Sequence, residues 1–207
     1  MNKWKVQPPN GLRALFPHTV WRRKKEGKTL YLTFDDGPVE KETTWVMNLL
    51  DEYKLKATFF CVGENADKNS YLMDELLNRG HSVGNHAYNH LPAWKCSRQA
   101  YFNNIEKARP FIKGGLFRPP HGQLYPWYMN ALNEQFKSIV MWDVLAMDYD
   151  NRLSQQQVLN NVLNHTREGS ILLFHDSKKA WKRMHYALPA ALDVLLKDGY
   201  RFKTFEM

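Results

Sequence analysis

The chain has 207 residues, of which 43% are hydrophobic and 14% aromatic, and a formal net charge of +8 at pH 7. This composition excludes a disordered chain, and the length favours a single domain with one sizeable core. The two cysteines, Cys61 and Cys96, are too few for a disulfide framework and form no C-x-x-C pair, so we expect reduced, structural thiols. No run of 18 apolar residues occurs, so no transmembrane segment is expected.

The first 28 residues are interpreted as a basic N-terminal extension or connector. Polar residues and prolines interrupt them too early for the apolar region of a signal peptide. A cytoplasmic location is therefore expected, with an envelope-associated location as the alternative if a leader is missing. The run "WRRKKEGK" at 21–28 favours a solvated connector over a contact with an acidic partner. Zinc-finger, RNP-like and basic-zipper patterns are absent from the sequence, which argues against a nucleic-acid partner.

From residue 29 onward, β-like and helical segments alternate. The expected strands are TLYLTF (29–34), ATFFCV (57–62), HSVGNH (81–86), GLFRPP (115–120), SIVMWDV (138–144), SILLFHD (170–176) and YRFKTF (200–205). The expected helices span 41–53, 70–80, 98–109, 127–135, 154–165 and 186–197. Seven strands joined by six helices predict an α/β fold with a parallel sheet covered by helices. Near-continuous apolar strands need cover on both faces, which favours closure into a barrel.

Polar side chains stand where the predicted strands end. They are Asp35 and Asp36 after the first strand, His86 and His90 after the third, Arg118 at the fourth, Asp148 after the fifth, and His175 with Asp176 at the sixth. In parallel α/β barrels the carboxyl ends of the strands form one mouth that holds the active site. We therefore expect these side chains to share one site.

Asp36 and the stretch "HAYNH", His86 to His90, suggest a catalytic metal site. Two imidazoles four residues apart can converge on one ion, and a carboxylate supplies a third ligand while positions stay open for water and substrate. The alternative is a polar loop in which His86 bonds a backbone carbonyl. The two aspartates expected on the same mouth favour the metal.

Asp35 and His175 are candidates for proton transfer. Asp35 diverges from its neighbour Asp36 and could act as a general base. The alternative for Asp35 is a turn cap at the strand end. His175 could act as general acid, and the alternative is a core histidine bonded to the backbone.

Five stretches together resemble a known family. "TFDDGP" (33–38), "HAYNH" (86–90), "RPPHG" (118–122), "WDVLAMDY" (142–149) and "LLFHD" (172–176) are similar in order and spacing to the motifs of the NodB-homology polysaccharide deacetylases, carbohydrate esterase family 4. The resemblance covers about residues 29–205. It implies that 29–207 form one domain, a distorted (β/α)7 barrel that removes acetyl groups from sugars with a divalent metal.

The resemblance also implies a role for each motif residue. Asp35 resembles the catalytic base, and Asp36, His86 and His90 resemble the metal ligands. Arg118 would orient the base, His175 would be the acid, and Asp148 would tune it. The substrate-binding residues implied are His121 through its backbone N–H, Leu173 against the acetyl methyl, Trp142 and Tyr149. The implied metal is Zn²⁺, with Co²⁺, Ni²⁺ or Mn²⁺ as alternatives.

The expected function is hydrolysis of acetyl groups on a glycan that contains N-acetylglucosamine, such as peptidoglycan or a chitin-like oligosaccharide, by a monomer. O-acetyl esterase activity on xylan-type glycans and a non-catalytic sugar-binding barrel are the alternatives. Three positions depart from the family pattern: Leu145 replaces a carboxylate of the fourth motif, His121 replaces an aromatic residue, and Ala87 replaces a hydroxyl residue. They leave substrate preference and metal choice open.

Overall fold

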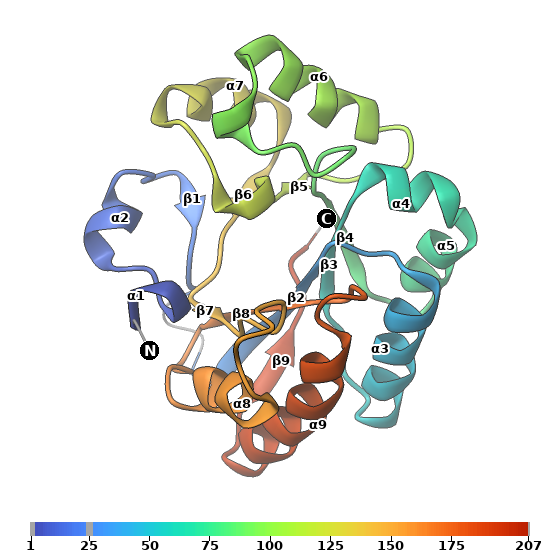
Figure 1. Ribbon diagram of the computed structural model, residues 1–207, viewed down its shortest axis with the longest axis vertical. Coiled ribbons are helices and arrows are strands. Elements are labelled where there is room, and N and C mark those ends of the chain that lie inside the picture. Colours follow the sequence, from blue (N-terminus) through green and yellow to red (C-terminus); the bar gives the residue numbers. More distant parts are fainter. Residues whose placement is uncertain (1–2, 24–26, 207) are drawn as a thin grey trace.

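The computed structural model describes residues 3–23 and 27–206, and its strands form one curled, parallel sheet with helices outside (Figure 1). The strands are β1 (Thr19–Val20), β2 (Thr29–Asp35), β3 (Thr58–Cys61), β4 (Ser82–Asn85), β5 (Leu116–Phe117), β6 (Ser138–Val140), β7 (Val144–Leu145), β8 (Ile171–His175) and β9 (Arg201–Lys203). Their order is β1-β6-β5-β4-β3-β2-β8-β7, with β9 beside β2. This is the single-domain, distorted (β/α)7 barrel that the motifs predicted.

The helices cover the outside of this sheet and include all six that the sequence predicts. They are α1 (Lys3–Val6), α2 (Asn10–Ala14), α3 (Glu40–Glu52), α4 (Gly63–Lys68), α5 (Ser70–Asn78), α6 (Arg98–Ala108), α7 (Met129–Gln135), α8 (Gln155–Leu163) and α9 (Trp181–Lys197). Three short 3-10 turns are η1 (Ala93–Lys95), η2 (Pro120–Gly122) and η3 (Pro126–Tyr128). No helix of the described residues is long and apolar enough to cross a membrane.

Two central strands show why the sheet needs cover on both sides. Every residue of β2 and of β8 is buried. Strands of this kind occur where both faces pack against other elements. Because β2 and β8 pair in parallel from Tyr31 to Asp35, their carboxyl ends finish at the same level, with Asp35 opposite His175.

Helix α9 begins earlier than the sequence predicts, at Trp181 instead of residue 186. Met184, Ala187, Leu188 and Ala191 are all buried. This spacing of three and four residues forms one apolar stripe, which extends the amphipathic helix through its first turn. Helix α4 was also missed, because its six residues show no apolar periodicity long enough to predict a helix.

The stretch 138–144 was predicted as one strand, and this prediction was wrong. The structure divides it into β6, which pairs with β5 and β1, and β7, which pairs with β8. Between them, the Arg118 guanidinium donates to the carbonyl oxygens of Val140 and Met141 at 3.0 and 2.9 Å. A side chain thus satisfies backbone acceptors that a continuous strand would pair with a neighbour.

The N-terminal segment lies at the seam between the two ends of the sheet, beside β6 and β7 in Figure 1. Strand β1 pairs with β6, and Arg22 forms an antiparallel bridge with Ser170 just before β8. Trp21 is buried. Residues 19–22 therefore take part in the sheet, although the sequence placed 1–28 in an extension or connector ahead of the barrel. Lys24, Lys25 and Glu26 of the basic run lie outside the described residues.

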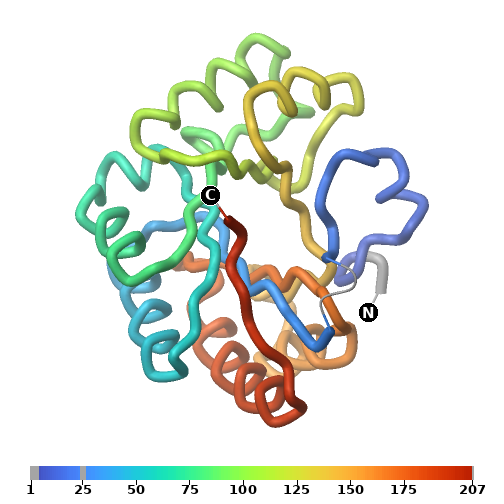
Figure 2. Tube along the Cα trace, turned by 180° about the vertical axis from the view of Figure 1, so that it is seen from behind, coloured from blue at the N-terminus to red at the C-terminus, as the bar shows by residue number. Residues whose placement is uncertain are grey.

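The C-terminal segment covers the opposite face of the barrel, as Figure 2 shows from behind. Strand β9 pairs with the first half of β2. Phe205 is buried, its N–H donates to Thr58 Oγ1 at 3.1 Å, and its carbonyl accepts from Ser82 Oγ at 2.5 Å. The barrel is thereby covered at the end away from the polar strand ends.

Candidate active site

A pocket of about 440 Å³ opens at the carboxyl ends of the strands. Of the side chains that the sequence assigned to a site, all line this pocket except Arg118 and Asp148. Those two are fully buried, and each contacts a lining residue from behind. Leu145 and Lys179 also line the pocket. The structure therefore brings the whole predicted set together at one place.

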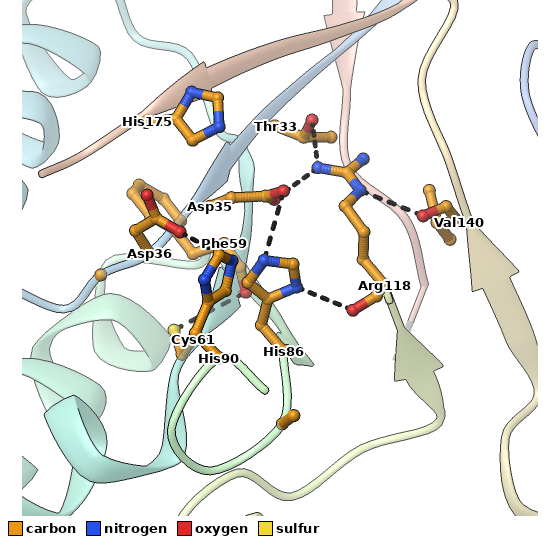
Figure 3. A network of polar contacts seen from close by, with 12 residues as sticks. Thr33, Asp35, Asp36, Phe59, Cys61, His86, His90, Arg118, Val140 and His175 are labelled. Atoms are coloured by element: carbon orange, nitrogen blue, oxygen red, sulfur yellow. Dashed lines mark hydrogen bonds and ion pairs between the residues drawn. The ribbon is translucent and has the colours of Figure 1, made fainter. Parts of the chain in front are cut away.

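Asp35 ends strand β2 and is held by Arg118, which comes from the loop after β5 (Figure 3). Arg118 Nη1 donates to Asp35 Oδ1 at 2.6 Å and to Thr33 Oγ1 at 2.9 Å. Both partners of the ion pair are buried. Burial raises the pKa of Asp35 above its usual range, and the Arg118 charge opposes that rise. Asp35 is thus a fixed carboxylate whose second oxygen, Oδ2, is free to face the pocket.

Three donor side chains lie close together beside Asp35. One ligand atom from each of Asp36, His86 and His90 can be chosen so that all lie within 4.8 Å of one another. His90 Nε2 is 3.3 Å from Asp36 Oδ1, and His86 Nε2 is 3.6 Å from Asp35 Oδ2. Two imidazoles and a carboxylate are a donor set suited to zinc and its neighbours in the first transition series.

The histidines have the protonation state that a metal requires. Burial lowers the pKa of His86 to about 4 and that of His90 to about 3. Both rings are therefore neutral at pH 7, with a lone pair available. His86 Nδ1 lies 2.7 Å from the Arg118 carbonyl oxygen, so Nδ1 carries the proton and Nε2 keeps the lone pair that could bind an ion. The bond from His86 to a backbone carbonyl, which was the alternative to metal binding, is present and is compatible with a metal site.

Asp36 has an unusual backbone, with a φ of 80°, and the loop that carries it is held from two sides. Asn65 Nδ2 donates to the Asp36 carbonyl at 2.7 Å. The Gly37 N–H donates to Asp176 Oδ1 at 3.1 Å, and Thr43 Oγ1 lies 2.5 Å from Asp176 Oδ2. A Cβ on residue 37 would lie 2.0 Å from Asp176 Oδ2, so glycine is required at this position.

Sequence reasoning placed Asp176 at the mouth with the other polar strand ends, but it did not predict this supporting role or the part played by Thr43 and Asn65. Asp176 is buried and directly follows His175, but its side chain bonds the loop after β2 and does not enter the pocket. Burial raises the pKa of Asp176 to about 8. Its place at the end of the sixth predicted strand, within "LLFHD", was the sequence signal, and nothing in that stretch points to Gly37 or Thr43.

His175 lies across the pocket from the donor set and is paired with Asp148. His175 Nδ1 is 2.8 Å from Asp148 Oδ1, and the His175 N–H donates to Asp148 Oδ2 at 2.8 Å. Burial alone would lower the pKa of His175, but Asp148 outweighs it and raises that pKa to about 9. The ring is therefore protonated at pH 7 and can donate a proton from Nε2.

Apart from Lys179, the rest of the lining is apolar and aromatic. Leu173 and Leu145 come from the neighbouring strands β8 and β7 and lie opposite each other in register. Trp142 and Tyr149 also line the pocket, and the Tyr149 ring packs edge-on against His175. His121 has a φ of 57°, and its ring centre is 4.2 Å from that of His90. A small acyl group could be enclosed between these walls.

The chain is similar to known deacetylases over most of its length. A family model described as polysaccharide deacetylase matches residues 22–137. The chain is 33% identical to a peptidoglycan-N-acetylglucosamine deacetylase of Bacillus cereus, over 90% of this chain and 91% of that one.

Solved structures give the same result. A crystal structure of a peptidoglycan N-acetylglucosamine deacetylase superimposes with a TM-score of 0.84 and 29% identity, over 91% of each chain. The Xyl-CE4 domain of a multidomain xylanase from the hindgut metagenome of Trinervitermes trinervoides has a TM-score of 0.73 and 30% identity, over 85% of this chain and 86% of that one. The chain therefore belongs to the polysaccharide deacetylase family, and it is an enzyme that removes acetyl groups from a glycan.

Proposed function

We propose that this deacetylase hydrolyses the acetamide of N-acetylglucosamine units in peptidoglycan or a similar glycan, with Zn²⁺ at the Asp36, His86 and His90 site. The observation that carries the proposal is the arrangement of charge around one pocket. A fixed carboxylate, Asp35, lies beside three metal donors, and a protonated histidine, His175, faces them.

The donor set fits a divalent ion. Its two imidazoles are neutral, and the pocket leaves room for water and substrate. Its carboxylate is ionised because nearby histidines, His175 above all, outweigh burial and lower the pKa of Asp36. An ion held here supplies Lewis acidity toward water and the acyl carbonyl.

The protein's own groups perform the proton transfers. Asp35 Oδ2 accepts a proton from the water that attacks the carbonyl carbon, and Arg118 keeps this carboxylate in one orientation. His175 donates a proton to the amide nitrogen as the C–N bond breaks, so acetate and an amine leave. Asp148 stabilises the imidazolium before this step. The backbone N–H of His121 is the proposed donor to the developing oxyanion.

The substrate assignment is supported by the relatives. The Bacillus cereus relative is named for peptidoglycan N-acetylglucosamine, whereas a xylanase domain is among the similar structures. An amide is the more demanding substrate, because its amine leaves only when protonated, and the His175–Asp148 pair provides that proton. A peptidoglycan substrate also favours the envelope-associated location over the cytoplasmic one.

Acetate release from a panel of glycans tests the proposal. The metal-loaded enzyme would be incubated with peptidoglycan fragments, chitin oligomers and acetylated xylan. A chelator-treated sample would be measured on the same substrates before and after Zn²⁺ is restored. We expect release from the N-acetylglucosamine substrates and recovery of activity with Zn²⁺. Release from acetylated xylan alone would contradict the substrate assignment, and undiminished activity in the chelator would contradict the metal site.

A further inference from the structure

Lys179 lines the active pocket, but no step of the proposed hydrolysis uses it. Among the described residues that line this pocket, it is the only lysine or arginine. It lies in the turn between β8 and α9, and its side chain is exposed to solvent. A cation at the rim of such a pocket can recognise a group that the substrate carries beyond the acetamide.

The turn that carries Lys179 is fixed to the acid side of the pocket. Arg183 Nη2 donates to the Lys179 carbonyl at 2.7 Å, and Arg183 Nε donates to the Asp148 carbonyl at 2.5 Å. Arg183 is itself buried. One buried side chain therefore holds the backbone of Lys179 in place relative to the His175–Asp148 pair.

The Lys179 ammonium faces an aromatic ring of the same pocket. It lies 5.5 Å from the centre of the Tyr149 ring, which is a cation–π distance. The Tyr149 ring in turn packs edge-on against His175, with the ring centres 4.9 Å apart. In the described part of the chain, no carboxylate forms an ion pair with Lys179. Its positive charge is therefore available to a ligand of opposite sign.

The direction of the reaction places the glycan on this side of the pocket. In the proposed hydrolysis His175 protonates the amide nitrogen, so the sugar that carries this nitrogen lies toward His175. Exposure to solvent rises from buried His175 through half-buried Tyr149 to exposed Lys179. A unit next to the reacting sugar would therefore come within reach of the Lys179 side chain.

We propose that Lys179 binds a carboxylate carried by the sugar unit next to the N-acetylglucosamine that is deacetylated. The inference rests on the proposed function, because peptidoglycan alternates N-acetylglucosamine with a sugar that bears a lactyl carboxyl group, whereas chitin is uncharged. This carboxyl group is either free or joined to a peptide with carboxylates of its own. A charge-assisted hydrogen bond to Lys179 then favours the acidic glycan over the neutral one.

A substrate and its methyl ester isolate the contribution of the carboxylate. The peptide-free tetrasaccharide of peptidoglycan has free lactyl carboxylates, and methylation removes their charge. Lys179→Gln should lower kcat/KM on the acid about fivefold, as expected for one charged contact at a partly exposed rim. It should change kcat/KM on the ester less than about twofold. An equal loss on acid and ester would overturn the proposal.

The peptide-bearing tetrasaccharide distinguishes the two sources of the carboxylate. A loss of kcat/KM in Lys179→Gln on the peptide-free acid assigns the contact to the lactyl group. A loss on the peptide-bearing form alone assigns it to the peptide, and either result supports the proposal. No loss on either form would overturn it.

Two further variants separate a specific contact from general attraction to a basic surface. Lys178→Gln removes the same charge one position earlier, where the side chain is exposed and lines a different pocket beside the loop after β2. It should change kcat/KM on the acidic substrates less than about twofold. Lys179→Arg keeps the charge and should restore most of the activity lost in Lys179→Gln. Equal losses in Lys178→Gln and Lys179→Gln would overturn the proposal.

Binding of a deacetylated product tests the contact without turnover. The tetrasaccharides whose N-acetylglucosamine units have already lost their acetyl groups would be titrated into the metal-loaded enzyme, as acid, as methyl ester and with peptide. Lys179→Gln should weaken binding of an acidic product about fivefold and binding of the ester less than about twofold. This result without deacetylation of any glycan would refute the proposed function and leave the Lys179 contact standing. Normal deacetylation of peptidoglycan, with no effect of Lys179→Gln on any acidic product, would do the reverse.

Discussion

Four histidines line the active pocket, and three of them, His86, His90 and His175, are held in opposite states on its two sides. His86 and His90 have pKa values of about 4 and 3, whereas the pKa of His175 is about 9. His86 and His175 are both buried, and each directs Nδ1 at an oxygen. The oxygen is a neutral backbone carbonyl for His86 and the Asp148 carboxylate for His175.

Because burial lowers the pKa of both rings, the neighbour at Nδ1 is what separates their protonation states. A carbonyl fixes the tautomer and leaves the ring neutral, so the other nitrogen can bind a metal. A buried carboxylate holds the proton on the ring, so the other nitrogen can act as an acid. The adjacent aspartates differ in which effect is larger: burial raises the pKa of Asp35 in spite of Arg118, whereas nearby histidines lower the pKa of Asp36 in spite of burial.

The largest expected effect comes from removing the charged ligand of the metal side. Asp36→Ala should abolish metal retention and reduce acetate release to background, because two neutral imidazoles alone hold a divalent ion weakly. Metal content by mass spectrometry, beside acetate release, measures both. A variant that keeps stoichiometric metal would show that Asp36 is not a ligand.

Asp35→Asn should separate its role from that of its neighbour. We expect the metal to stay bound while kcat falls about 10²- to 10⁴-fold, the usual contribution of a positioned general base. The substitution keeps the shape and the contact with Arg118 but removes the proton acceptor. Loss of the metal, or nearly normal turnover, would contradict the division of labour between the two aspartates.

His175→Ala tests the acid side of the pocket. On an acetamide the loss should be about 10²- to 10⁴-fold. On an activated aryl ester it should be far smaller, because that leaving group departs without protonation. Parallel rates on both substrates provide the comparison, and equal losses would argue that His175 does not protonate the leaving group.

Much of the fold and most of the site could be predicted from the sequence, because both depend on local pattern. Strand β2 is an apolar run that ends at Asp35, and Asp36 and "HAYNH" are short motifs with their own metal-binding chemistry. The parallel arrangement then brings strand ends together whatever the details of packing. Lys179, which lines the pocket, had no such pattern.

What the sequence could not show depends on contacts between distant segments. The division of 138–144 into β6 and β7 follows from Arg118 binding the carbonyls between them, and Arg118 is more than 20 positions away. Asp176 supports Gly37 across 139 positions, and β1 joins the sheet through only two residues. Neither a short strand nor a buried polar contact leaves a periodic signal.

The smallest expected effect, and the one specific to the contrast between the histidines, is that of Asp148→Asn on the pH profile. The imidazolium of His175 is the active form, so kcat/KM in the wild type should hold up to high pH and fall as pH rises through about 9.

Asparagine at position 148 preserves an acceptor for the His175 N–H but removes the charge that raises the pKa of His175. Burial then lowers that pKa. The basic limb should therefore move to lower pH, with a loss that is large at pH 8 and becomes smaller as the pH falls. The acidic limb belongs to Asp35 and should stay in place. Profiles of kcat/KM from pH 5 to 10 for wild type and variant measure both limbs, and an unmoved basic limb would mean that Asp148 only supports the His175 backbone.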